Sequence, residues 1–395
     1  MNILWLVRGV PDLDNISPII YKLLIAGYRI EVVLDFDDPS EILTHPILKF
    51  LDRSEAFFIV NSLNRKSPYC QIMSYLDSMV FDMLICDWGE GIPHSLLHRA
   101  VYFLRSRKIS YRQKWLMAAK SAGLRLVAFP HGYNTRIDIK TKSNNVLRSV
   151  LNRLNISMTI EDYSDRSIFD LYIFNNQYYR EVCTKYYKMS KVSTEVIGPF
   201  KYSQWWLDVL SREVYSDLVN VTREKDNDCE LRMAFFIPKW ANNVNMKLVD
   251  EFVERLQSFN KIKVFFQKHP RKGVSEPTDV ITSAIENIDS FSLSCKDSRQ
   301  ILYEVDLVID FGSSIALDAL VQGIPVIYPV YTQSNTSILS DLPGVYELYS
   351  YSDLEQVVHQ VIEKKVDIGL VSDSLGVVQS EEDIEFALSC ILLGS

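Results

Sequence analysis

The sequence predicts an α/β protein of two doubly wound domains, each a parallel sheet with helices on both faces. Short apolar runs of strand length alternate with longer segments of helical period along most of the 395 residues. The chain is too long for one ordinary domain. A charged stretch with few apolar residues interrupts the alternation at positions 222–230. We therefore expect an N-terminal domain over 1–222, a linker over 223–230 and a C-terminal domain over 231–395, both Rossmann-like.

The first half is expected to begin with a buried strand, because residues 3–7 are apolar and the run ends at Arg8. The expected order is strand 3–7, helix 16–26, strand 30–35, helix 39–51, strand 56–60, helix 69–79, strand 83–86, a largely helical 93–122 and strand 124–129. The pattern then blurs. We expect a mobile loop over 135–145, helices over 146–154 and 203–221, and further strands of the same sheet at 171–175 and 195–198.

The alternation restarts after the charged stretch, which predicts a second sheet of the same kind. The expected order is strand 233–237, helix 247–259, strand 262–267, helices 277–287 and 298–303, strand 307–310, helix 313–321, strand 325–329, and helices 353–364 and 380–393. Two similar halves of this kind place their ligands outside the carboxyl ends of their strands.

Charge and cysteine usage narrow the class of protein. The formal net charge of −8 argues against broad nucleic-acid binding, which needs clustered Lys and Arg. The six cysteines show no C-x-x-C spacing and indicate reduced, packed thiols without a zinc site. No apolar run approaches the roughly 20 residues of a membrane-spanning helix. We expect a cytoplasmic protein with at most peripheral contact with the inner face of the plasma membrane.

A glycine and two serines follow the strand expected at 307–310. Gly312 lets the backbone turn tightly, while Ser313 and Ser314 open the next helix with N–H groups and hydroxyls where the helix dipole favours an anion. This arrangement predicts phosphate binding. The alternative is that one serine only caps the helix.

Basic side chains gather after the strand expected at 262–267. Lys268, His269, Pro270 and Arg271 form a turn in which imidazole can donate to a phosphate oxygen and the cations can neutralise it. Parallel strands end at one edge of their sheet, so we expect this turn near the serine turn. Lys239, after the strand expected at 233–237, is a further candidate for a diphosphate; a solvated lysine is the alternative.

The first half offers a candidate for proton transfer after the strand expected at 124–129. A histidine with a near-neutral pKa, such as His131, could take a proton from an acceptor hydroxyl. The alternative is a histidine that bonds the backbone of its own turn. Gly132 and Asn134 of the same turn are expected on the acceptor side.

Two carboxylates offer alternatives to that base. Asp87 and Glu90 follow the strand expected at 83–86, and either could act as the base or orient the histidine. The alternative is that both are ordinary loop carboxylates without a catalytic role. Arg8, after the first strand, is a further acceptor-side candidate or else a surface charge.

Several familiar enzyme motifs are absent from the sequence. It contains no G-x-x-x-x-G-K-[ST], no G-x-G-x-x-G after the first strand, no H-E-x-x-H and no G-x-S-x-G. Nucleotide kinases, classical dehydrogenases, zincins and α/β-hydrolases are therefore disfavoured. No clustered carboxylate motif calls for a metal, and we expect none.

The His-Gly turn, the His-Pro turn and the Gly-Ser-Ser helix start together resemble bacterial GT-B type transferases that build surface polysaccharides. The nearest in pattern are the CDP-glycerol glycerophosphotransferases of teichoic acid and the CMP-sugar-dependent Kdo and sialic acid transferases. The first resemblance implies that His131 is the base and that His269, Ser313 and Ser314 hold the donor phosphates. The sialyltransferase pattern, an acidic motif for the base and His-Pro for CMP, is matched in part by Glu90-Gly91 and His269-Pro270.

The resemblance implies two domains facing across a cleft. It also implies transfer of a sugar or glycerol-phosphate-type group from a cytidine nucleotide donor to a hydroxyl of a bacterial surface glycan, free or lipid-linked. The nucleotide-activated donor is a substrate, and no cofactor is expected. A nucleotide-sugar epimerase of the same architecture and a non-catalytic scaffold of a polysaccharide assembly complex stay open as alternatives.

Overall fold

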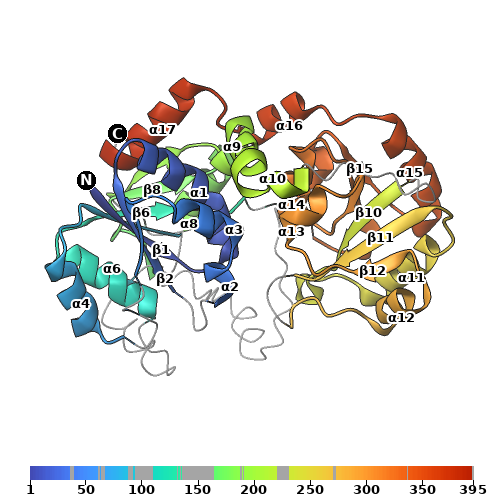
Figure 1. Ribbon diagram of the computed structural model, residues 1–395, viewed down its shortest axis with the longest axis horizontal. Coiled ribbons are helices and arrows are strands. Elements are labelled where there is room, and N and C mark those ends of the chain that lie inside the picture. Colours follow the sequence, from blue (N-terminus) through green and yellow to red (C-terminus); the bar gives the residue numbers. More distant parts are fainter. Residues whose placement is uncertain are drawn as a thin grey trace. The chain divides into compact units, whose positions relative to one another are not determined.

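The computed structural model describes residues 1–35, 40–60, 63, 67–87, 92–93, 110–130, 132–133, 135, 164–186, 189, 191–219, 231–269, 273–335 and 337–393. The chain forms two compact units (Figure 1). The first contains Met1–Tyr133, Asn145–Val214 and Leu375–Ser395, and the second contains Asn134–Asn144 and Tyr215–Ser374. The expected second domain, 231–395, differs from this division because the chain returns to the first unit at Leu375.

The first unit is built on a seven-stranded parallel sheet with the order β3-β2-β1-β4-β6-β8-β9. Its strands are β1 (Asn2–Val7), β2 (Arg29–Leu34), β3 (Phe57–Val60), β4 (Met83–Asp87), β6 (Arg125–Phe129), β8 (Leu171–Phe174) and β9 (Ser193–Val196). A separate antiparallel pair joins β5 (Ile92–Pro93) to β7 (Ser164–Asp165).

Helices lie on both faces of this sheet (Figure 1). They are α1 (Val10–Ile25), α2 (Ser40–Leu43), α3 (Pro46–Leu51), α4 (Tyr69–Ser78), α6 (Tyr111–Ser121), α8 (Gln177–Tyr186), α9 (Gln204–Val209) and α17 (Glu381–Leu393), with a 3-10 turn η2 (Phe200–Tyr202) and a π-helical turn η3 (Leu210–Val214). Leu4 and Leu6 of β1 pack in one core with side chains of α4, α6 and α8. Trp5, between them, instead contacts the Phe129 ring at 5.9 Å. Alternate side chains of one buried strand thus supply two apolar layers.

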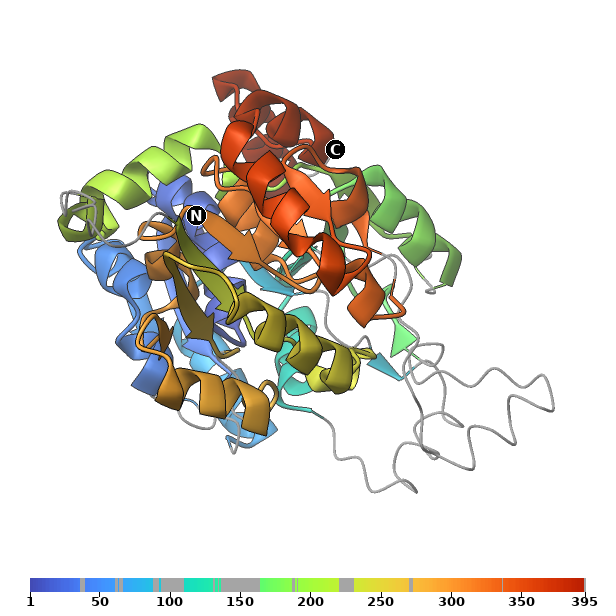
Figure 2. The same cartoon turned by 90° about the vertical axis from the view of Figure 1, so that its right-hand side faces the viewer.

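The second unit is built on a six-stranded parallel sheet with the order β12-β11-β10-β13-β14-β15. Its strands are β10 (Leu231–Phe236), β11 (Ile262–Gln267), β12 (Phe291–Leu293), β13 (Leu307–Ile309), β14 (Val326–Tyr328) and β15 (Val345–Glu347). Its helices are α10 (Ser216–Val219), α11 (Met246–Leu256), α12 (Asp279–Asn287), α13 (Ser298–Leu302), α14 (Ile315–Leu320), α15 (Leu354–Glu363) and α16 (Ile368–Leu375), with 3-10 turns η4 (Trp240–Asn242), η5 (Val330–Thr332), η6 (Ile338–Asp341) and η7 (Tyr351–Asp353). Figure 2 shows this sheet and its helices from the side.

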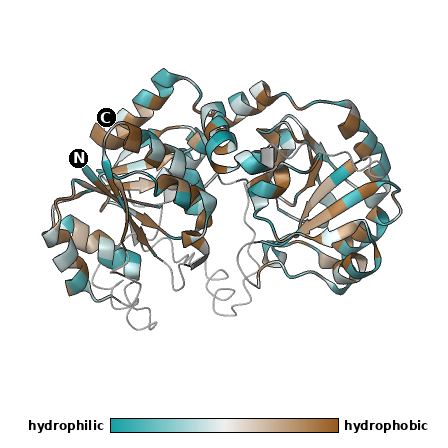
Figure 3. Cartoon of the chain, in the orientation of Figure 1, coloured by the Kyte–Doolittle hydropathy of each residue, from teal (hydrophilic) through white to brown (hydrophobic). Residues whose placement is uncertain are grey.

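The apolar residues concentrate on the strands and on the inner helix faces (Figure 3). In the second unit, Phe235 lies at the centre of one core, with ring centroids 5.1 Å from Phe266 and 5.4 Å from Phe311. Phe252 of α11 covers the same layer at 6.0 Å. The run of buried aromatics therefore fixes how β10, β11 and the segment after β13 lie against one another.

The two parallel sheets confirm the expected fold class, because each has the strand order of a doubly wound domain. In such a sheet the order reverses once, and ligands bind beyond the carboxyl ends of the strands at that point. The reversal lies between β1 and β4 in the first unit and between β10 and β13 in the second. These two places are therefore where functional side chains are expected.

Most of the expected strands are observed within two residues, but several helices differ. The first helix begins at Val10 and not at 16, because its polar residues Asp12 and Asn15 are buried with hydrogen-bond partners. Pro46 separates α2 from α3 where one helix was expected. The helix expected over 203–221 is interrupted by the π-helical turn, and α8, α16, β12 and β15 were not expected. The first residue of the expected helical segment 93–122, Pro93, belongs to β5, and the helix described in this segment begins at Tyr111.

Some expectations lie outside the described residues. They are the helix at 146–154, the linker at 223–230 and nearly all of the loop at 135–145.

Five cysteines are free thiols: Cys70, Cys86, Cys183, Cys295 and Cys390. Within the described ranges, no helix is both long and apolar enough to cross a membrane.

One guanidinium holds the C-terminal helix to the first unit. Arg125, the first residue of β6, donates to the carbonyl oxygens at the end of α17: Ile391 at 2.8 Å, Leu392 at 2.6 Å and Cys390 at 3.3 Å. A cation at this end of a helix satisfies carbonyls that have no partner in the helix and complements the helix dipole.

Replacing Arg125 with alanine is expected to lower the free energy of unfolding by about 2 kcal/mol, because several hydrogen bonds from a charged donor are lost. Amide hydrogen exchange should speed up in α17 first. Glu381→Ala serves as the control, because its ion pair with Lys22 at the other end of the helix is exposed and should contribute less than about 1 kcal/mol. Equal exchange in Arg125→Ala and wild type would show that other contacts hold the helix.

Candidate functional site

The register of the second sheet brings the two predicted phosphate-binding turns to one edge. Phe235 on β10 pairs with Phe266 on β11 and with Ile309 on β13. His269 and Gly312 each follow three residues after a member of this paired row. Only β10 separates their strands, which corresponds to two strand spacings, or about 10 Å, between β11 and β13. They therefore lie on either side of the strand-order reversal.

The serine turn is folded around a buried carboxylate. Asp310 is 1% exposed, and its Oδ1 accepts the backbone N–H groups of Gly312 at 2.9 Å and Ser313 at 2.6 Å. Its Oδ2 accepts the Ser313 hydroxyl at 2.6 Å. Gly312 has φ of 90°, a backbone conformation that favours glycine. The donors of Ser313 are thus already used by the protein itself.

Ser314 is in a different situation. It is the N-cap residue of α14, but its side chain makes no capping hydrogen bond. The capping role considered for this serine is therefore not the one observed, and its hydroxyl is the serine donor that can reach a ligand. The sequence alone did not distinguish the roles of the two serines, because it does not show which of them the Asp310 carboxylate binds.

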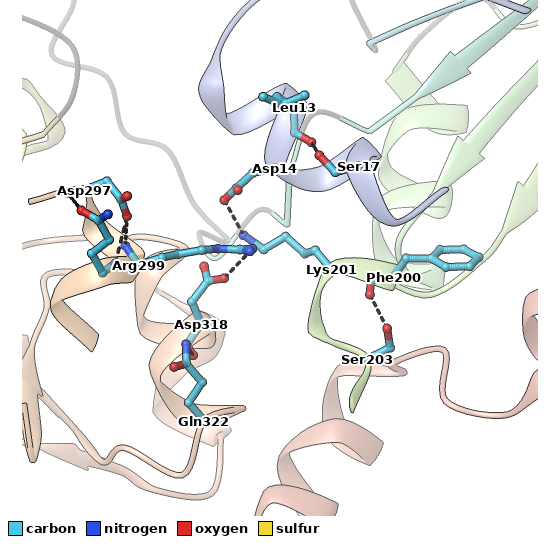
Figure 4. A network of polar contacts seen from close by, with 11 residues as sticks. Leu13, Asp14, Ser17, Phe200, Lys201, Ser203, Asp297, Arg299, Asp318 and Gln322 are labelled. Carbon is cyan, nitrogen blue, oxygen red and sulfur yellow. Dashed lines mark hydrogen bonds and ion pairs between the residues drawn. The ribbon is translucent and has the colours of Figure 1, made fainter. Parts of the chain in front are cut away.

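The helix that follows the turn is anchored by a buried ion pair (Figure 4). Arg299 of α13 contacts the Asp318 carboxylate of α14 at 3.2 Å, and their side chains are 7% and 5% exposed. Asp297 caps α13 by accepting the N–H groups of Arg299 and Gln300 at 2.8 and 2.9 Å. This pair fixes the helix on which the turn depends.

The His-Pro turn is also tied to the second unit. The backbone N–H of His269 donates to the Ser275 hydroxyl at 2.6 Å, and Ser275 is 2% exposed. Lys268 forms an ion pair with Glu276 at 2.7 Å, and its hydrogen bond lowers the pKa of that carboxyl. His269 itself is half-buried. Its backbone is therefore fixed while part of its surface stays accessible.

The remaining predicted residues of this edge are placed as follows. Lys239 lies three residues after the end of β10 and is the N-cap residue of η4, on the side of the strand-order reversal. The neighbouring Trp240 donates through Nε1 to the Glu276 carbonyl at 2.8 Å, which joins this segment to the loop after β11. Pro270 and Arg271 lie outside the described residues.

In the first unit, the strand-order reversal carries a network of buried charges. Asp87, at the end of β4, forms ion pairs with Arg8 through Oδ2 and with Arg112 through Oδ1, the latter at 2.7 Å. Arg112 also lies 3.9 Å from Asp35, and Arg8 donates its backbone N–H to Asp12 at 2.9 Å. The Asp87 side chain is 5% exposed, whereas Arg8 is 33% exposed. Both oxygens of Asp87 are therefore occupied by guanidinium groups.

Asp12 gives this network a pH dependence. Burial raises its pKa to about 6, from 3.8, and the Asp87 carboxylate adds to this effect while the Arg8 guanidinium opposes it. Between these pH values the folded state holds a proton that the unfolded chain has lost. The free energy of unfolding should therefore fall as the pH rises from about 4 to about 6, by up to about 3 kcal/mol.

The variant Asp12→Asn should not show this loss, because its amide cannot ionise and can still accept from Arg8. Urea unfolding at pH 4.5 and pH 7 measures the effect. We expect the variant to gain stability relative to wild type between the two pH values. A difference between the two proteins that is the same at both pH values would contradict it.

The turn after β6 is held by two asparagines that the sequence did not reveal. Asn15 of α1 donates to the Pro130 carbonyl at 2.5 Å, and Asn175 donates to the Gly132 carbonyl at 3.1 Å. Both amides are nearly buried. The backbone on either side of position 131 is thus fixed by side chains from distant segments.

Three predicted residues of the first half, His131, Glu90 and Asn134, lie outside the described residues. Among the residues that are described, no group of three or more His, Cys, Asp or Glu side chains is arranged to hold a metal ion. The carboxylates around Arg8 and Arg112 are thus a charge network compensated by guanidinium groups.

Comparison with known proteins extends the fold assignment. No protein-family model matches the chain, and no curated protein does. Among solved structures, S. aureus MnaA with UDP matches with a TM-score of 0.59 at 12% identity, over 99% of this chain and 95% of that chain. The UDP-GlcNAc 2-epimerase of Neisseria meningitidis, bound to UDP-GlcNAc, matches with 0.59 at 11% identity, over 99% and 100%.

A glycosyltransferase of Rickettsia africae matches with a TM-score of 0.56 at 10% identity, over 100% of this chain and 99% of that chain. Identities this low carry information about fold only. The chain therefore has the GT-B type fold of two Rossmann-like domains. The similar structures with this fold include epimerases and a glycosyltransferase.

Proposed function

We propose that this protein is a nucleotide-sugar-dependent glycosyltransferase whose second unit binds the donor nucleotide. One observation carries the proposal. A turn locked by Asp310 follows β13 at the strand-order reversal of the second sheet, and the strand that leads to His269 lies two strand spacings, or about 10 Å, from β13. Ligands of open parallel sheets bind at this place.

The side chains of this edge suit a phosphate group. The Ser314 hydroxyl and the His269 imidazole are donors, and Lys239 and Lys268 add positive charge. Arg271, two residues after His269 in the sequence, is proposed as a further cation. As the bond to the transferred group breaks, negative charge develops on the leaving nucleotide, and fixed donors stabilise it. The protein would thus need no metal for this step.

The first unit is proposed to activate the acceptor. His131 is the preferred base, because the carbonyls of its sequence neighbours Pro130 and Gly132 are held by Asn15 and Asn175, and Glu90 is the alternative. Asp87 is less suited to take a proton because both its oxygens bind guanidinium groups. We assign it the role of holding Arg8 at the edge of the sheet. The acceptor is proposed to be a hydroxyl of a surface glycan.

Two lines of support favour different donor nucleotides. The sequence resemblance favours a cytidine donor, whereas two of the similar structures contain UDP or UDP-GlcNAc. Calorimetric titration of the full chain with CMP, CDP and UDP separates these options. Binding of one of them supports the proposal. Binding of none would contradict it and would favour a non-catalytic scaffold.

A second candidate function is a nucleotide-sugar epimerase, because several of the similar structures are UDP-GlcNAc 2-epimerases. An epimerase needs no acceptor. Incubation with UDP-GlcNAc alone, followed by proton NMR of the sugar, distinguishes the two activities. A new epimer without an acceptor supports the epimerase. An unchanged sugar that is consumed only when a glycan acceptor is added supports the transferase.

A further inference from the structure

Two successive peptide groups of the serine turn are each held at both ends by side chains. In the peptide between Phe311 and Gly312, the carbonyl accepts Gln333 Nε2 at 3.1 Å and the N–H donates to Asp310 at 2.9 Å. In the next peptide, the Gly312 carbonyl accepts Thr135 Oγ1 at 2.7 Å and the Ser313 N–H donates to Asp310 at 2.6 Å. Neither peptide plane can rotate without breaking two hydrogen bonds.

The threonine in this arrangement comes from a remote part of the sequence. Thr135 is 4% exposed and lies 177 residues before Gly312 along the chain. Its own carbonyl accepts the Ser337 hydroxyl at 2.7 Å and the Ile338 N–H at 2.9 Å. Thr135 is therefore itself fixed in the second unit, and its hydroxyl has a defined direction.

The orientation of these peptides matters for an anion. Glycine at φ of 90° lacks the side chain that restricts other residues, so its flanking peptides can flip at low cost. A flip of the second peptide would turn the Gly312 carbonyl oxygen toward the Asp310 carboxylate, which would open the turn and displace the serines that follow. Fixation at both ends keeps the Gly312 carbonyl on Thr135 and the Ser313 N–H on Asp310, and so holds the backbone that leads to Ser314.

We propose that Thr135 and Gln333 are positioning residues of the nucleotide-phosphate site, because they fix the peptide groups on either side of Gly312 so that Ser314 meets the phosphate. The inference rests on the proposed function and adds to it the residues that preorganise the site. Neither residue touches the phosphate in this account. They act through the backbone, so their hydroxyl and amide donors matter more than their bulk.

Substitutions that keep shape and remove the donor test this account. Thr135→Val removes the hydroxyl, whereas Thr135→Ser retains it and serves as the rescue. Gln333→Met removes the amide at similar length. Asp306→Ala is the matched control, because Asp306 accepts the Arg232 N–H at 3.0 Å at the opposite edge of the same sheet. Affinity for CMP, CDP and UDP is measured by calorimetry on the full chain, and thermal unfolding is measured in parallel.

We expect Thr135→Val and Gln333→Met each to weaken binding of the preferred nucleotide by about tenfold, the effect of one lost hydrogen bond of about 1.4 kcal/mol. Thr135→Ser should bind within about threefold of wild type. Asp306→Ala should lose thermal stability and keep its nucleotide affinity.

Wild-type affinity in folded Thr135→Val would overturn the inference, since the hydrogen bonds to the two peptide groups would then only stabilise the fold. If that variant does not fold, wild-type affinity in Gln333→Met has the same meaning. A wild-type protein that binds none of the three nucleotides refutes the proposed function and the inference together. Nucleotide binding that is insensitive to both substitutions refutes the inference alone.

Discussion

Replacing His269 with alanine is expected to lower turnover of a nucleotide-sugar donor by about 100-fold, the effect of losing one fixed donor to a group that gains negative charge. The backbone of His269 is held by Ser275, and its strand lies in register with the strand that leads to Gly312, with β10 between them. The loss should therefore affect the chemistry of the site and not the fold. Steady-state release of the nucleotide measures the turnover, and thermal unfolding should change little.

The matched control for this experiment is His359→Ala. His359 lies in α15 of the same unit and is exposed, so its loss should leave turnover unchanged. Similar turnover in His269→Ala and wild type would remove His269 from the site. Equal losses in both histidine variants would point to a general effect on the second unit.

Replacing Asp87 with alanine is expected to lower the free energy of unfolding by about 3–5 kcal/mol, because two guanidinium groups lose a shared and nearly buried counterion. Arg112, with a side chain 12% exposed, would keep only the more distant Asp35 carboxylate. Urea unfolding measures the change at a fixed pH of 7, where Asp12 is largely ionised.

An exposed ion pair provides the comparison. Lys247 and Glu251 of α11 lie 3.7 Å apart, and the lysine side chain is 84% exposed. Lys247→Ala should cost less than about 0.5 kcal/mol, because solvent screens such pairs. If Asp87→Ala costs no more than Lys247→Ala, the network at the end of β4 does not have the strength that its burial implies.

The strands and their ends could be predicted from the sequence because strands buried on both faces read as unbroken apolar runs. The run at 262–267 and the run at 307–310 gave β11 and β13 almost to the residue, and with them the edge that carries His269 and Gly312. The strands β12 and β15 are as short as β13 but less buried, so they do not read as unbroken apolar runs and were not recognised.

Polar residues that are buried explain most of what could not be predicted. Asp12 and Asn15 lie inside α1, yet their polarity places them outside an apolar helical pattern, so the helix was expected six residues too late. Arg125 holds α17 through contacts that span 265 residues or more, which no local pattern encodes. The sequence could therefore not show that the C-terminal helix belongs to the first unit.

The same limit applies to the site. The Gly-Ser-Ser motif was recognised, but the different roles of Ser313 and Ser314 depend on where the Asp310 carboxylate points. Thr135 was expected only as part of a loop, and its contact with Gly312 depends on the folded chain. Motifs thus located the turn, and only three-dimensional contacts show how it is held.

A crystal structure of the full chain with the tightest-binding of CMP, CDP and UDP would show where the nucleotide phosphates lie. Phosphate oxygens are expected within hydrogen-bonding distance of the Ser314 hydroxyl and the His269 imidazole, with the Gly312 carbonyl still bound to Thr135. A nucleotide bound elsewhere, with both side chains away from its phosphates, would contradict this expectation.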